Sequence, residues 1–180
     1  MLGLLALSVI LGSCKNESQE KKEVTNPTQD EAVLESNKGQ AFIEDEASTP
    51  NILQIALKSS DHSTLVAAVQ AAELENALVN AGPLMVFAPT NAAFDALPPG
   101  TVEDLLKPEN KDALANILKY HVTPGNYSKD FLKNFKKLGQ ANNQNVAVEV
   151  KDNEVYVGGA KIIASVSAGN GIVHVVDKVI

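Results

Sequence analysis

The spacing of the apolar residues changes once along the chain, and this change constrains the fold more than any other feature. Across residues 51–135 apolar side chains recur at helical spacing, except in the short run Leu84–Ala88, which two prolines bracket. Such a bracketed apolar run predicts a buried strand. After Gly139 apolar residues alternate with others, which predicts β-hairpins; the alternating valines are Val146, Val148, Val150, Val155 and Val157. Helices around one early strand, followed by hairpins, predict an α+β fold.

Capping residues predict where the helices begin. Thr49 is expected to cap a helix whose first residue is Pro50, because Pro favours the first helical position. The other expected N-caps are Ser63, Thr90 or Asn91, Thr101 (with Asp104 completing a capping box) and Ser128. Further helices are expected over Glu73–Val79 and from Pro108 to Tyr120.

Composition excludes several classes of function. The formal net charge is -7, and every one of the 15 basic residues is Lys. An acidic chain without the bidentate guanidinium of Arg does not suit nucleic-acid binding. The chain has one cysteine, and its three histidines, His62, His121 and His174, lie far apart in sequence. We therefore expect no metal site and no cofactor.

The first residues are typical of a secretory signal. Met1–Ile10 is almost wholly apolar but about half as long as the ~20 residues that a membrane-spanning helix needs. The tetrad Leu11–Cys14 resembles the lipobox of bacterial lipoproteins. This resemblance implies a signal peptide over residues 1–13 and a lipidated Cys14 as the mature N-terminus; the alternative is an ordinary thiol. Lys15, in place of Asp after the cysteine, favours an outer-membrane location.

The next stretch, residues 14–50, is predicted to be an acidic flexible tether. It carries Glu or Asp at nine positions and Lys at four, and no helical or alternating period persists in it. A segment of this kind buries too little apolar surface to offset its ordering entropy. The folded domain is therefore expected over residues 51–180.

Three motifs together resemble the fasciclin domain. They are Met85–Phe94, Tyr120–Val122 and Asn170–Ile180, in an order and at separations that fit that family, and the resemblance covers residues 51–180. It implies several short helices packed on a β-sandwich or β-wedge, in a secreted, non-enzymatic adhesion module. One departure is Ala164-Ser165-Val166, where many relatives carry Ala-Asp-Ile.

Most motif residues are expected to be architectural: Phe87, Pro89, Thr90, Asn91, Phe94, Gly171, His174 and Asp177. Gly171 is expected to relieve a turn, and His174 to be a half-buried, hydrogen-bonded histidine. His174 and Asp177 are three residues apart, so on a regular strand they face opposite sides and form no dyad. No catalytic residue is predicted.

Tyr120 and His121 are the residues to which the resemblance assigns partner binding. In animal relatives this region is linked to integrin binding, which would require a host here. The alternative is that both residues only close the end of a helix, with His121 placed favourably by the helix dipole.

These features lead to one functional hypothesis and two alternatives. The hypothesis is a secreted protein anchored in membrane lipid through Cys14, at the outer membrane or cell surface or on the periplasmic face. Its domain would bind an unknown surface protein or polysaccharide. The alternatives are a periplasmic hydrolase, which needs His121 or His174 to pair with a distant Ser or Asp, and a carrier of a small apolar ligand between the helices and the strands.

Overall fold

The computed structural model describes residues 49–80 and 82–180. The predicted signal peptide, Cys14 and all but the end of the predicted tether lie outside these residues. They stay predictions.

The helices of the described chain are short. In chain order they are α2 (Ile52–Lys58), the 3₁₀ turn η2 (Ser60–His62), α3 (Ser63–Ala71), α4 (Glu75–Asn80), α5 (Asn91–Asp95), α6 (Thr101–Leu105), the 3₁₀ turn η3 (Pro108–Asn110), α7 (Lys111–Tyr120) and α8 (Lys129–Leu132). All of them precede the hairpins that begin at Lys137, as the change in apolar spacing predicts.

The strands form one seven-stranded mixed sheet in the order β2-β1-β7-β6-β5-β4-β3. Their bounds are β1 (Leu84–Pro89), β2 (Val122–Pro124), β3 (Lys137–Gly139), β4 (Asn145–Lys151), β5 (Glu154–Val157), β6 (Ala160–Ala168) and β7 (Gly171–Val176). Among the strands that the structure describes, only β1 and β7 pair in parallel, with Leu84 opposite Gly171. The Ala141 N–H donates to the carbonyl of Val122 at 2.7 Å, so the two ends of the sheet meet and the sheet nearly closes into a barrel. The predicted α+β class is confirmed.

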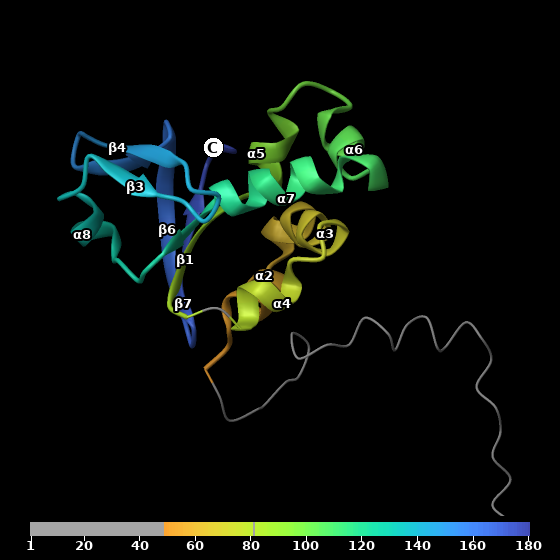
Figure 1. Cartoon of the computed structure of the whole chain (residues 1–180). Coiled ribbons are helices and arrows are strands. Elements are labelled where there is room, and N and C mark those ends of the chain that lie inside the picture. Colours follow the sequence, from red (N-terminus) through yellow and green to blue (C-terminus); the bar gives the residue numbers. More distant parts are fainter. Residues whose placement is uncertain (1–48, 81) are drawn as a thin grey trace, which may run out of the picture. The chain divides into compact units, whose positions relative to one another are not determined.

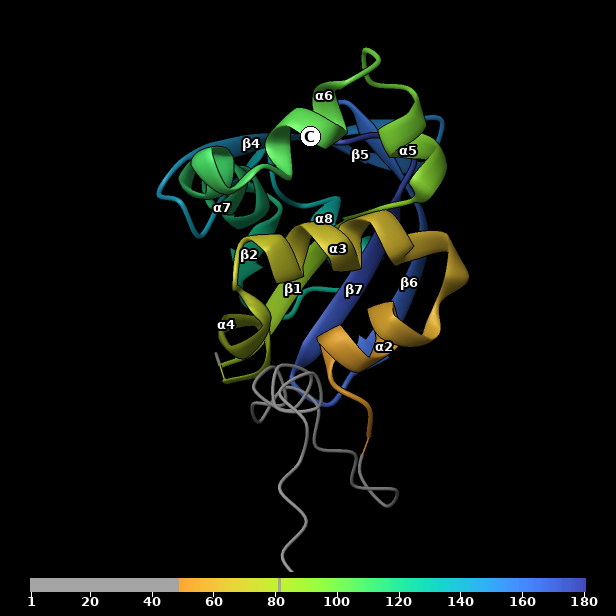
Figure 2. The ribbon, with the colours of Figure 1, turned by 90° about the vertical axis from the view of Figure 1, so that its right-hand side faces the viewer.

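Two apolar cores lie on opposite faces of β1 and β7. Figure 1 shows α2, α3, α4 and α7 on one side of the long strands and β3, β4 and α8 on the other, and Figure 2 shows α2 and α3 in front of β6 and β7. We call the first the helix-side core; it includes Leu53, Leu65, Val69, Val86 and Val173. The second, the sheet-side core, includes Met85, Phe87, Leu132, Val155 and Val157.

Strand β1 supplies side chains to both cores. Val86 belongs to the helix-side core, whereas Met85 and Phe87 belong to the sheet-side core, because successive side chains of a strand point to opposite faces. All six residues of β1 are buried. This double burial explains why the sequence here is a continuous apolar run instead of an alternating one.

Two of the predicted caps are confirmed. The Thr90 Oγ1 accepts a hydrogen bond from the Ala93 N–H at 3.3 Å and caps α5, and the Ser128 Oγ accepts one from the Phe131 N–H at 3.3 Å and caps α8. Both caps depend only on residues three positions apart, which is why the sequence reveals them.

Three other predicted helix starts are wrong. Helix α2 is capped by Asn51, which forms a reciprocal capping box with Gln54, so neither Thr49 nor Pro50 is the start. Ser63 and Thr101 are each the first residue of their helix and cap nothing. For α6 the N-cap is Gly100, whose backbone is left-handed (φ 84°).

Candidate functional site

The first motif joins the sheet to the helices. Phe87 is fully buried and Phe94 is half-buried against the helix-side core, while Pro89 ends β1 with its side chain buried. Asn91 does not cap its own helix. Its Oδ1 accepts a hydrogen bond from the Thr64 N–H at 3.0 Å and its Nδ2 donates to the carbonyl of Ser60 at 2.9 Å. Asn91 therefore caps α3 from 27 residues away.

Gly171 is the first residue of β7 that pairs with β1, and this position has no space for a side chain. A Cβ at this position would overlap the carbonyl oxygen of Leu84 on the neighbouring strand. The glycine therefore permits the close approach of two parallel strands, and its expected role in the adjoining turn stays a prediction.

Asn170, the residue before Gly171, fixes two helices to the sheet. Its Oδ1 accepts a hydrogen bond from the Ile52 N–H at 3.0 Å, at the start of α2, and its Nδ2 donates to the carbonyl of Leu78 in α4 at 2.7 Å. The β6–β7 turn thus satisfies backbone groups of two helix ends that have no partner inside their helices.

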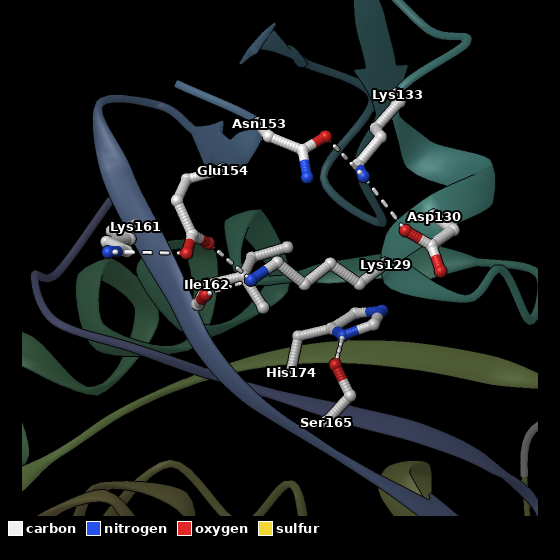
Figure 3. Close-up of polar contacts among 9 residues, drawn as sticks. All are labelled: Lys129, Asp130, Lys133, Asn153, Glu154, Lys161, Ile162, Ser165 and His174. Carbon is white, nitrogen blue, oxygen red and sulfur yellow. Dashed lines mark hydrogen bonds and ion pairs between the residues drawn. The ribbon is translucent and has the colours of Figure 1, made fainter. Parts of the chain in front are cut away.

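His174 is more deeply buried than expected. Its side chain is 0% exposed and stacks on Phe87 with ring centroids 5.8 Å apart. The ring Nε2 lies 2.9 Å from the carbonyl oxygen of Tyr127 and therefore donates to it, so in the neutral ring Nδ1 accepts from the hydroxyl of Ser165 at 2.7 Å (Figure 3). Burial lowers the pKa of His174; the Tyr127 carbonyl opposes this, and the charge of Lys129 adds to it.

Asp177 does not join His174. Its Oδ1 accepts a hydrogen bond from the Lys161 N–H at 2.7 Å, on the exposed side of β6. The two residues form no dyad, as their spacing predicts. The partner of His174 is instead Ser165, directly opposite it across β6 and β7. Sequence reasoning missed this pair because it depends on the register between the strands.

An ion-pair cluster lies above His174 and holds α8 on the hairpins (Figure 3). The ammonium of Lys129 lies 2.6 Å from the Glu154 carboxylate and donates to the carbonyl of Ile162 at 3.0 Å, while Lys161 lies 3.7 Å from the same carboxylate. The hydrogen bond and the charge of Lys129 lower the pKa of Glu154, and Lys161 adds to this. The cluster carries two positive charges against one negative charge, and its contacts join α8 to β5 and β6.

His121 is 3% exposed and follows the last residue of α7. Its Nδ1 donates to the carbonyl of Ile117 at 2.9 Å, and its Nε2 accepts from the Ile180 N–H at 3.1 Å. Burial lowers the pKa of His121, against the opposing effect of the Ile117 carbonyl. Tyr120 is half-buried, and its hydroxyl donates to the carbonyl of Asn145 at 3.3 Å. Partner binding by these two residues stays a prediction. Of the two, Tyr120 is the more exposed to solvent.

A cavity of about 210 Å³ lies in the helix-side core. Its lining is apolar except for Lys119 and the ring of His121, whose two nitrogens are both hydrogen-bonded within the protein. The lining residues that are exposed to solvent are Ala77, Lys119 and Ala141, so the cavity opens between α4, α7 and the segment after β3. A second, smaller cavity of about 40 Å³ adjoins the first, and Leu65 and Leu118 line both.

Neither metal ligands nor a membrane span are found in residues 49–80 and 82–180. No group of three or more His, Cys, Asp or Glu side chains is placed to hold a metal ion there. Within the same residues no helix combines the length and the apolar character needed to cross a bilayer.

Comparisons with known proteins agree with the three motifs. The fasciclin-domain model matches residues 60–180. Protein sll1483 of Synechocystis sp. is 45% identical over 157 residues, which are 86% of this chain and 87% of that protein. Transforming growth factor-beta-induced protein ig-h3 of Oryctolagus cuniculus is 34% identical over 146 residues, 79% of this chain but 21% of that protein.

A solved structure shares the fold. The FAS1 domain pair from the insect cell adhesion molecule fasciclin I superposes with a TM-score of 0.50 at 20% sequence identity, over 63% of this chain and 42% of that one.

Proposed function

The chain belongs to the fasciclin-domain family, and on that premise we propose that it is a lipid-anchored, non-enzymatic binding module of the bacterial cell envelope. Its domain contacts a partner at the cell surface. The lipids are carried by Cys14, and the acidic tether lets the domain reach its partner. Two acyl chains suffice for stable anchoring, since each buried methylene contributes about 0.8 kcal/mol.

The observation that carries the proposal is an open stretch of β6. From Ala164 to Ala168 this strand pairs with β7 on one side, after an irregularity at Ile163, whereas β5 pairs with β6 only at Ala160 and Lys161. In the part of the chain that the structure describes, no strand covers the other side of the stretch. Ile163 is 51% exposed and Val166 is 41% exposed, and none of these residues is charged.

An open strand edge favours a protein partner over a polysaccharide. Its unpaired N–H and C=O groups match those of an extended peptide, which can add to the sheet as a further strand. Natural proteins usually protect such edges with Lys, Pro or a covering element. We therefore assign the β6 edge, residues 163–168, as the contact surface for an extended segment of a partner protein.

The test compares two charged substitutions of similar exposure. In a strain without the gene, the full chain, Ile163→Lys and Val150→Lys are each restored, and attachment to surfaces and to neighbouring cells is counted. Val150 is 46% exposed but lies on β4, where it pairs with Val155 of β5 and stands between two charged residues, Glu149 and Lys151, of the kind that protect a strand edge. We expect Ile163→Lys to reduce attachment at least tenfold and Val150→Lys to leave it within twofold.

Two controls decide the outcome. Protease treatment of intact cells must remove the domain if it lies at the cell surface, and circular dichroism must show that both variants fold. Unchanged attachment of the strain without the gene would refute the adhesive role. Equal loss in both variants would refute the β6 edge as the contact.

A hydrolase is the second candidate, and the Ser165–His174 hydrogen bond is the observation that favours it. A serine within 2.7 Å of a histidine that is itself oriented resembles an activated nucleophile. Two features oppose it. His174 is oriented by a carbonyl instead of a carboxylate, and burial together with Lys129 disfavours the imidazolium that catalysis would form. We expect a fluorophosphonate probe to leave Ser165 unmodified; labelling that is lost in Ser165→Ala would favour the hydrolase.

A further inference from the structure

We propose that the cavity in the helix-side core is a binding site for one small, uncharged apolar molecule. This site is independent of the β6 edge. It deepens the alternative of an apolar carrier by giving it a location, walls and a ligand size.

Helices that line the cavity are held in place by side chains from other elements. Asn170 holds the start of α2 and the end of α4 through the Ile52 N–H and the carbonyl of Leu78. Asn91 holds the start of α3 through the Thr64 N–H. Three of the four helices that line the space, α2, α3 and α4, are therefore each fixed by a side chain from a distant part of the chain. Such anchoring keeps the space open before a ligand arrives, and a preformed site lowers the cost of binding.

The lining selects for an apolar ligand. Leu53, Leu65 and Val69 face the cavity from the helices, and Val86 and Val173 face it from the sheet. The one buried polar side chain that lines it, His121, already uses both ring nitrogens for backbone groups. A polar or charged ligand would lose its hydration there without gaining a hydrogen bond, which is unfavourable.

The volume sets the size of the ligand. An engineered apolar cavity of about 150 Å³ binds benzene, which has six non-hydrogen atoms. By proportion, the 210 Å³ found here corresponds to roughly eight non-hydrogen atoms, and the opening of the cavity to solvent leaves room for a slightly larger ligand. A compact aromatic hydrocarbon fits this size, whereas a long acyl chain and an amphipathic peptide do not. Ala77 and Ala141, the small exposed residues of the lining, leave the entrance open.

Naphthalene, with ten carbon atoms, is a direct probe. The chain contains no Trp, so the fluorescence of naphthalene is read over a low protein background. The full chain is titrated with naphthalene, and the methyl resonances of Leu65, Val69 and Val173 are followed by NMR. We expect saturable binding of one molecule and shifts at these methyl groups.

Filling variants make the test specific. Ala56 and Ala77 line the cavity from α2 and α4, so Ala56→Leu and Ala77→Leu should each weaken naphthalene binding at least tenfold. Ala67 is an exposed residue of α3 that lines neither space, so Ala67→Leu should bind within twofold of the unchanged chain. Melting temperatures show whether each variant folds. Absence of saturable binding up to the solubility limit, or equal binding by both filling variants and the control, would overturn the proposal.

Discussion

The two cores of the domain differ in how completely they are filled. In the sheet-side core Phe87, Leu132, Val155 and Val157 are each 0% exposed, and a buried histidine has both ring nitrogens hydrogen-bonded. The helix-side core contains the 210 Å³ cavity, although it shares β1 and β7 with its neighbour.

The difference follows from how each core is closed. Strands of the sheet-side core are joined to their neighbours by backbone hydrogen bonds, which hold neighbouring side chains close together. On the helix side, separate short helices are fixed at their ends by single residues such as Asn91 and Asn170. Fixed ends prevent the helices from collapsing into the space between them. One face of the same two strands is thus built for stability and the other has room for a ligand.

The largest effect is expected where the two cores share a wall. Gly171→Ala places a Cβ against the carbonyl oxygen of Leu84, so β1 and β7 must separate and both cores lose their common strands. We expect a loss of more than about 4 kcal/mol, or no folding at all. Urea unfolding measures it, with Gly82→Ala as the control because nothing lies within 4 Å of a Cβ there. A stable Gly171→Ala protein would show that the two cores do not depend on this wall.

Matched leucine truncations compare the cores directly. Leu132→Ala removes a fully buried side chain from the sheet-side core and should cost about 4 kcal/mol. Leu65→Ala only enlarges an existing space, because Leu65 already lines both cavities, and should cost about 2 kcal/mol. The free energy of unfolding in urea measures both. Equal costs would contradict the difference in packing between the cores.

Acid should weaken the folded state through its histidines. Burial lowers the folded-state pKa of His62, His121 and His174, so below pH 6.5 the unfolded chain takes up protons that the folded chain does not. Stability is therefore lost as the pH falls from 6.5 towards the folded-state values, by about 1.4 kcal/mol per pH unit for each histidine that stays neutral.

The His174→Gln variant isolates the contribution of the sheet-side core. Between pH 7.5 and 5.5 it should lose about 1.4 kcal/mol less stability than the unchanged chain, since glutamine does not titrate. Urea unfolding at several pH values measures the difference, and NMR of the His174 ring measures its pKa. An identical pH dependence in both proteins would mean that folding does not lower the pKa of His174.

The smallest effect on stability is expected from removing one helix cap beside each of the two cores. Thr90→Ala uncaps α5 beside the helix-side core, and Ser128→Ala uncaps α8 beside the sheet-side core. Each should cost about 1 kcal/mol, because each removes one hydrogen bond to a helix N-terminus. Thermal unfolding compares the two variants. A markedly larger cost for one of them would show that its core depends on the position of the capped helix.

The sequence was informative about features that depend on neighbouring residues. The change in apolar spacing predicted the α+β class, and Thr90 and Ser128 were identified as caps because the bonded N–H lies three residues away. Prediction failed at Thr49, Ser63 and Thr101, because a nearby residue is the N-cap of each of these helices instead. At the start of α2 the reciprocal bonds of Asn51 and Gln54 satisfy two backbone groups at once.

The candidate sites were less accessible to sequence reasoning. The Ser165–His174 pair depends on the register between β6 and β7, and the open edge of β6 depends on where β5 stops pairing. The composition permitted an apolar ligand, yet only the packing of helices against strands shows where one fits.

What the sequence determined by itself is the order of short helices and hairpins, the doubly buried strand β1 and the family motifs, because backbone preference and apolar periodicity act over a few residues. The tertiary structure alone decided that Asn91 caps a helix 27 residues away, that Gly171 serves a close approach between strands, and that a cavity remains in one core. These properties arise from contacts between segments far apart in the chain, whose distances no local pattern of residues specifies.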